Sequence, residues 1–120
     1  MKSDKQMPKI FDFWVTEIPK IESYKDFKEK YPEGSEGYSL FHSFGRYWEV
    51  LGALAYDGHI SPELVLDALG GPAYNAKVNM IVEGIREETN NPVRYEHWQY
   101  LAEKSYAYWE KRKKSPRYEG

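Results

Sequence analysis

Three amphipathic helix patterns, separated by explicit stop and start signals, fill residues 38 to about 112. In each pattern large apolar side chains recur at steps of three and four, as they do on the buried face of a helix. The separators are DGHISPE at 57–63, GGP at 70–72 and NNP at 90–92, and Gly, Pro and Asn are residues that end helices. The sequence therefore predicts an all-α fold, a compact bundle of four longer helices plus one or two short ones.

The separators also predict where the helices begin and end. Gly58 suits the left-handed position that follows a helix over residues 38–56. Ser61 then precedes Pro62, and a cap followed by proline predicts a short helix over residues 62–69. Pro72 is expected to open the next helix, whose apolar stripe runs from Tyr74 to Ile85. The last helix is expected from about Val93 to Lys113.

Two glycines lie on or near the apolar face of the 38–56 helix. Gly45 and Gly52 are seven residues apart, and glycine costs a helix about 1 kcal/mol relative to alanine. Their position predicts that another helix approaches this face closely.

The N-terminal third is less regular. We expect residues 1–7 to be frayed, a helix to start at Pro8, and Pro19 to stop or kink it. Ser23 is placed to cap a second short helix over residues 23–30. A chain of 120 residues fits one domain, so residues 1–120 are expected to form a single helical domain.

Charge and composition bound the class of protein. The net charge is −2, but residues 111–120 hold five basic residues and one acid, so the rest carries −6. An acidic body with a short basic tail is not the footprint of a dedicated DNA-binding protein. The chain has no Cys, which excludes disulfides and thiol chemistry, and no apolar run long enough to span a membrane. We expect a cytoplasmic protein without membrane association.

Two runs of sequence resemble a known family. Residues 46–61, RYWEVLGALAYDGHIS, resemble its segment YE-x-x-G-x-L-x-x-x-G-x-I-D/S, and residues 91–101, NPVRYEHWQYL, resemble the opening of its last helix. The family is the DUF4760-type group of uncharacterised bacterial and phage helical proteins, and the resemblance covers about residues 40–110. This chain departs from the family pattern in having Gln99 where an acid is commoner. The resemblance implies an all-helical fold and a bacterial or phage origin, and it implies no activity.

Four polar residues are the candidates for a small-ligand or catalytic site. His42, Arg46 and Glu49 share one face of the 38–56 helix, and Arg86 ends the stripe of the helix over residues 74–88. A histidine and a carboxylate on one face can do acid–base work. The alternative is structural: Glu49 and Arg86 form a partly buried ion pair that fixes how the helices meet.

Other chemistry finds little support in the sequence. The histidines at 42, 59 and 97 lack the close spacing of a helical metal pair, so no metal and no cofactor is expected. Asp57 and His59 are better explained by a helix end than by a metal site. The basic tail is more simply explained as a helix C-terminus, where cations are stabilising, than as a nucleic-acid contact.

Aromatic residues make up 17% of the chain, with 11 Tyr, 5 Phe and 4 Trp. The last helix carries rings on more than one face, which predicts that it is covered on two sides. Either a second subunit or the N-terminal helix of the same chain can supply that cover. The predicted interaction residues are Tyr95, Trp98, Tyr100, Tyr106, Tyr108 and Trp109.

The function that these features favour is a non-enzymatic helical module for protein–protein contact, with a homodimer as one form of that contact. The first alternative is a small-ligand binder or small enzyme with a site between the 38–56 and 74–88 helices. The second is a weak nucleic-acid binder acting through the basic tail.

Overall fold

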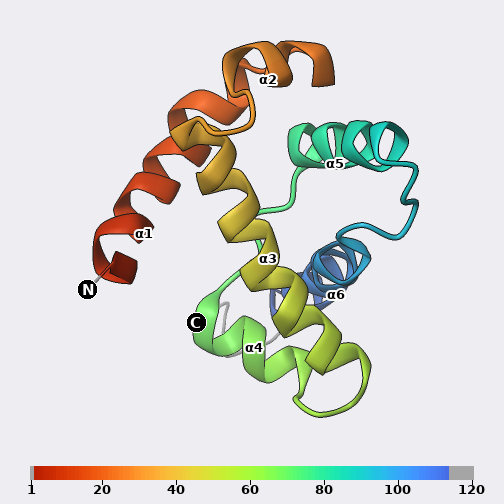
Figure 1. Ribbon diagram of the computed structural model, residues 1–120. Helices are drawn as coiled ribbons and strands as arrows, with labels where there is room; N and C mark the ends of the chain where they lie inside the picture. Colours follow the sequence, from red (N-terminus) through yellow and green to blue (C-terminus); the bar gives the residue numbers. More distant parts are fainter. Residues whose placement is uncertain (1, 114–120) are drawn as a thin grey trace. The chain divides into compact units, whose positions relative to one another are not determined.

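The computed structural model describes residues 2–113, in which helices are the only regular structure, and this confirms the all-α prediction (Figure 1). The elements in order are α1 (Lys2–Asp12), the π-helical turn η1 (Phe13–Glu17), the 3-10 turn η2 (Ile18–Lys20), α2 (Tyr24–Lys30), α3 (Glu36–Tyr56), α4 (Pro62–Leu69), α5 (Ala76–Glu88) and α6 (Glu96–Lys113). Four α-helices have 11 residues or more and two have 7 or 8, as predicted. Residues 114–120, which hold most of the predicted basic tail, lie outside the described residues. Among the residues described, no helix is long and apolar enough to cross a membrane.

The chain divides into two compact units, each built from two stretches of sequence. The first unit comprises residues 2–47 and 75–95, which include α1, α2, α5 and the first part of α3. The second unit comprises residues 48–74 and 96–113, with the rest of α3, α4 and α6. The boundary falls inside α3. The expectation of a single domain stays a prediction.

The predicted caps are present at two helix starts and one helix end. The Ser23 hydroxyl accepts the backbone N–H of Asp26 at 3.0 Å, and the Ser61 hydroxyl accepts that of Leu64 at 3.2 Å. Gly58 has φ +82° after α3, and the N–H of the next residue donates to a carbonyl five residues earlier. A serine oxygen satisfies an amide that the first helical turn leaves unpaired, and glycine adopts positive φ without a steric cost.

Three predicted helix starts were wrong. α1 begins at Lys2 and carries Pro8 in its interior, so residues 2–7 are helical rather than frayed. α5 begins at Ala76 instead of Pro72, because the Asn75 side chain supplies the cap by accepting the Val78 N–H at 3.0 Å. α6 begins at Glu96 instead of near Val93, since the preceding residue has φ +62°, which is outside the helical region.

The core of the first unit lies where α2 and η2 pack on α5. Its fully buried side chains include Ile18, Ile21, Phe27, Phe41, Val78, Ile81 and Val82. Gly84 permits the contact between α2 and α5, because a Cβ there would lie 2.1 Å from the ring of Tyr24. The absence of that one atom leaves room for the Tyr24 side chain against α5.

The core of the second unit centres on Trp98, which is fully buried together with Leu66 and Leu101. The Trp98 indole N–H donates to the Pro72 carbonyl at 2.9 Å, so its polar group is satisfied. A Cβ on Gly52 would lie 2.2 Å from the His97 carbonyl oxygen. The close approach predicted at Gly52 is therefore confirmed, and the neighbouring segment is the first turn of α6.

Candidate functional site

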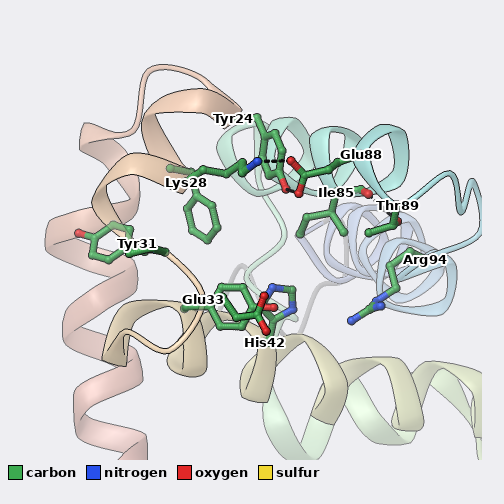
Figure 2. A pocket seen from close by; sticks show the side chains of 12 residues that line it. Tyr24, Lys28, Tyr31, Glu33, His42, Ile85, Glu88, Thr89 and Arg94 are labelled. Atoms are coloured by element: carbon green, nitrogen blue, oxygen red, sulfur yellow. Dashed lines mark hydrogen bonds and ion pairs between the residues drawn. The ribbon is translucent and has the colours of Figure 1, made fainter.

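The first unit contains a partly enclosed cavity of about 220 Å³, formed by α2, the loop after it, the start of α3 and the end of α5 (Figure 2). Its lining is Tyr24, Phe27, Lys28, Tyr31, Pro32, Glu33, Tyr38, His42, Ile85, Glu88, Thr89 and Arg94, and we call it the aromatic cavity. Two wider depressions, of about 440 and 480 Å³, are more open to solvent. Enclosure removes more of a ligand's surface from water, so the aromatic cavity is the candidate site.

The aromatic wall comes from one face of α2 and from the start of α3. Tyr24, Phe27 and Tyr31 follow one another at steps of three and four, which puts them on one side of α2. Tyr38 adds a fourth ring, with its centroid 4.4 Å from that of His42. The short helix therefore does two things: Phe27 fills the core, and its tyrosines line the cavity above it.

A polar network closes one rim. The Tyr24 hydroxyl donates to one carboxylate oxygen of Glu88 at 2.9 Å, and the Lys28 ammonium pairs with the other (Figure 2). Lys28 and Tyr24 together lower the pKa of Glu88, so this carboxylate stays charged. Burial and the Glu88 hydrogen bond raise the pKa of Tyr24 to about 12. At neutral pH this rim is a matched ion pair with a neutral tyrosine.

A buried histidine lies at the floor of the cavity. The His42 Nδ1 atom and the Tyr95 hydroxyl are 2.7 Å apart, and both side chains are buried. Burial, with the positive charges of Arg94 and Arg46, lowers the pKa of His42 to about 4. Burial raises the pKa of Tyr95, so the phenol keeps its proton. The Tyr95 hydroxyl therefore donates a hydrogen bond to Nδ1 of the neutral His42 ring.

Arg94 supplies the positive charge on the side of the cavity opposite Tyr31 (Figure 2). Its guanidinium lies over the Tyr95 ring, with the central carbon 5.0 Å from the ring centroid. Among residues 7–113, whose side chains the structure describes, it makes no ion pair with an acid. Lys28, in contrast, is neutralised by Glu88.

Of the four catalytic candidates, only His42 lines the cavity. Arg46 is on the same helix as His42 and is exposed, and its positive charge helps to lower the pKa of His42. Arg86 donates to the Arg94 carbonyl at 2.8 Å and pairs with Glu83 one turn earlier in α5. Arg86 thus holds the backbone of Arg94, which lines the cavity, while Arg86 itself is not part of the lining.

Glu49 lies in the second unit and caps α6. One carboxylate oxygen accepts the backbone N–H groups of His97 and Trp98, each at 3.0 Å, and the other lies 2.7 Å from His97 Nδ1. A negative charge at a helix N-terminus is stabilising, because it satisfies unpaired amides and opposes the helix dipole. The structure therefore shows Glu49 as a cap of α6, and both the ion pair with Arg86 and the role as a base stay predictions.

The predicted interaction residues of the last helix fall into two groups. Tyr95 and Trp98 are 4% and 0% exposed, so they belong to the cores of their units and not to a contact surface. Tyr100, Tyr108 and Trp109 are half-buried, while Tyr106 is 75% exposed. Tyr100 packs edge-on against Tyr56, and the Tyr108 hydroxyl donates to Asp67 of α4. Intrachain contacts with α3 and α4 thus account for much of the cover that we expected for α6.

The cavity offers rings, two cations, two carboxylates and a neutral histidine, a set of groups suited to holding a small molecule. In the described part of the chain, no three His, Asp or Glu side chains are grouped as a metal site would require. Sequence patterns did not single out Arg94 or Glu88, because neither position has a residue spacing that indicates a site. The Tyr24–Phe27–Tyr31 stripe was visible, but a stripe of this kind predicts a core face equally well.

The family model for a domain of unknown function, DUF4760, matches residues 2–105. The match covers the described first unit, all the residues of the aromatic cavity and the second unit as far as residue 105. Searches of the curated proteins and of the solved structures found no match.

Proposed function

We infer that this chain, which belongs to the DUF4760 family, is a small-ligand-binding domain. The observation that carries this proposal is the aromatic cavity, where four rings and several charged groups from α2, α3, α5 and the loops after α2 and α5 line one partly enclosed space. Binding sites for small molecules are concave, mostly apolar or aromatic, and have a few placed polar groups. The lining includes residues of α3 and α5, the two helices between which the alternative hypothesis expected a site, together with residues of α2.

Binding, with no covalent step, is the function that these groups support. His42 is neutral and buried, and its Nδ1 atom is engaged by Tyr95. Glu88 is held by Lys28 and Tyr24. These contacts fix the side chains in place before a ligand arrives, and a preorganised site spends less free energy on ordering when it binds.

A cavity-filling variant tests this proposal. Thr89 lines the cavity, and its hydroxyl donates to the carbonyl four residues earlier. Thr16 makes the same type of hydrogen bond in η1 and does not line the cavity. Single-ring compounds are screened by ligand-observed NMR against wild type, Thr89→Trp and Thr16→Trp. Binding to wild type and Thr16→Trp that is lost in Thr89→Trp supports the site, and equal binding to all three variants contradicts it.

The protein-contact function that the sequence favoured stays a prediction. Met7, Phe11 and Val15 follow one another at steps of four on α1 and η1, and they are 53%, 71% and 56% exposed. Such a stripe is compatible with contact to another protein, as is the exposed Tyr106. Sedimentation equilibrium measures the mass directly: twice the chain mass supports a homodimer, and the mass of one chain removes that form of the prediction.

A further inference from the structure

We propose that the ligand of the aromatic cavity is a small aromatic carboxylate, with its ring among the tyrosines and its carboxylate on Arg94. This inference rests on the proposed function, since it assigns a chemical class to the same site. It is carried by three observations: the size of the cavity, the state of its two cations and the balance of charge at its inner end.

The size of the cavity selects a single ring. A cavity of about 150 Å³ with apolar walls is large enough to hold benzene. The aromatic cavity measures about 220 Å³, which leaves room for one small substituent beyond a ring. Its rings can pack edge-on or offset against an aromatic ligand, the two arrangements that aromatic pairs prefer.

The two cations of the lining are in different states. Lys28 is bound to Glu88, so its charge is neutralised within the protein. Arg94 rests on the Tyr95 ring and, within the described residues, pairs with no carboxylate. A guanidinium presents several N–H groups in one plane and binds a carboxylate through two parallel hydrogen bonds. Arg94 is therefore the group that a ligand's carboxylate would neutralise.

The charges near the inner end of the cavity favour an anion. Arg94 and Arg46 both act on His42, and their combined charge is one reason why its pKa is low. The acids of the lining are Glu33, which is exposed on the loop after α2, and Glu88, which is already paired. Arg94 is in no ion pair with an acid among the residues whose side chains are described, so an anion placed beside it would be attracted and a cation repelled.

The direct test compares three planar probes of one size and different charge: benzoate, neutral benzamide and cationic benzamidine. Dissociation constants are measured with the full chain by ¹H–¹⁵N NMR titration. We expect benzoate to bind at least about tenfold more tightly than benzamide, because a hydrogen bond to a charged group contributes more than a neutral one. Benzamidine should bind most weakly. The preference for benzoate should also shrink as NaCl is raised, because salt screens the charge of Arg94.

Variants locate the anchor. Arg94→Gln should bring the benzoate-to-benzamide ratio close to one while benzamide still binds. Arg46→Gln, which removes the same type of charge from a residue outside the lining, should keep most of the ratio, as should Lys28→Gln. Circular dichroism checks that each variant is folded. If Arg94→Gln does not fold, the benzoate-to-benzamide affinity ratio of the wild-type chain and its dependence on salt test the carboxylate assignment by themselves.

The outcomes separate this inference from the proposed function. If benzamide binds as tightly as benzoate, or if Arg94→Gln keeps the full preference, the carboxylate assignment is overturned and the ligand site remains. If the loss of preference appears in Lys28→Gln instead, the anchor assignment is overturned. If none of the probes binds at millimolar concentration, the proposed function fails together with this inference.

Discussion

His42 and Tyr95 form a hydrogen bond of 2.7 Å inside the first unit, between a ring nitrogen on α3 and a hydroxyl just before α6. The two residues are far apart in the sequence and both are buried. Tyr95 reaches His42 with a backbone φ of +62°, an uncommon value for a residue with a large side chain. His42 lines the aromatic cavity, and the hydrogen bond from Tyr95 orients its neutral ring there.

The stability of the protein should depend on pH through His42. Its folded pKa is about 4, whereas a histidine in the unfolded chain titrates near 6.5. Between these values the unfolded chain binds a proton that the folded chain does not, so the free energy of unfolding falls as the pH falls. The expected loss from this group is on the order of 2 kcal/mol between pH 7 and pH 5.

Urea unfolding at pH 5, 6 and 7 checks this expectation. His42→Gln should flatten the dependence over this range, while His59→Gln, which removes an exposed histidine, should leave it as in wild type. Equal slopes for wild type and His42→Gln would show that His42 does not titrate as the structure implies.

Removing the Glu49 carboxylate should destabilise the second unit. Glu49→Ala takes away the acceptor for two backbone amides and a ring nitrogen of α6, and loss of a helix cap typically costs about 0.5–2 kcal/mol. Glu49→Gln keeps one acceptor oxygen and should cost less. Glu103→Ala removes an exposed acid from the same helix and is the control. Chemical unfolding that ranks Glu103→Ala as the most costly of the three would refute the capping role.

Two glycine substitutions should differ in effect. A Cβ at position 52 would meet the backbone oxygen of His97, whereas at position 84 it would meet the side chain of Tyr24. Backbone cannot move without shifting all of α6, so Gly52→Ala should cost about 1–3 kcal/mol or more. Gly84→Ala offsets part of its clash by a gain in helix propensity of about 1 kcal/mol. Thermal unfolding should therefore rank Gly52→Ala below Gly84→Ala, and the reverse order would contradict the packing described.

Trp98 and Tyr106 should behave as core and surface, although the sequence pattern placed both in one interaction set. Trp98→Ala should cost about 3–5 kcal/mol, because it removes a fully buried ring and leaves the Pro72 carbonyl without its donor. Tyr106→Ala should change the unfolding free energy by less than about 0.5 kcal/mol. A large loss of stability in Tyr106→Ala would instead indicate that this side chain is covered, for example by a second copy.

Local signals were sufficient for much of the fold. The roles of Ser23, Ser61 and Gly58 can be predicted from their neighbours in the sequence, because a helix cap or a left-handed turn involves only the nearest few residues. The cap of α6 was not visible in this way, since it comes from Glu49 on another helix. Its start was therefore placed too early, near Val93.

The candidate site depended even more on tertiary structure. His42 was singled out because it shares a helix face with a carboxylate, and it does line the cavity. Arg94 and Glu88 look like ordinary surface charges in the sequence. Only the tertiary structure shows that both line the cavity and that Glu88 is neutralised by Lys28. Spacing along one helix also put Glu49 with His42, although the two residues have different surroundings and different partners.

The central claim is that the aromatic cavity is a ligand site, and the most direct test is a map of benzoate-induced ¹H–¹⁵N chemical-shift changes on the wild-type chain. The account predicts saturable shifts concentrated in α2, the first turns of α3, the end of α5 and Arg94. Shifts confined to α4 and α6, or shifts that grow linearly without saturation, would contradict it.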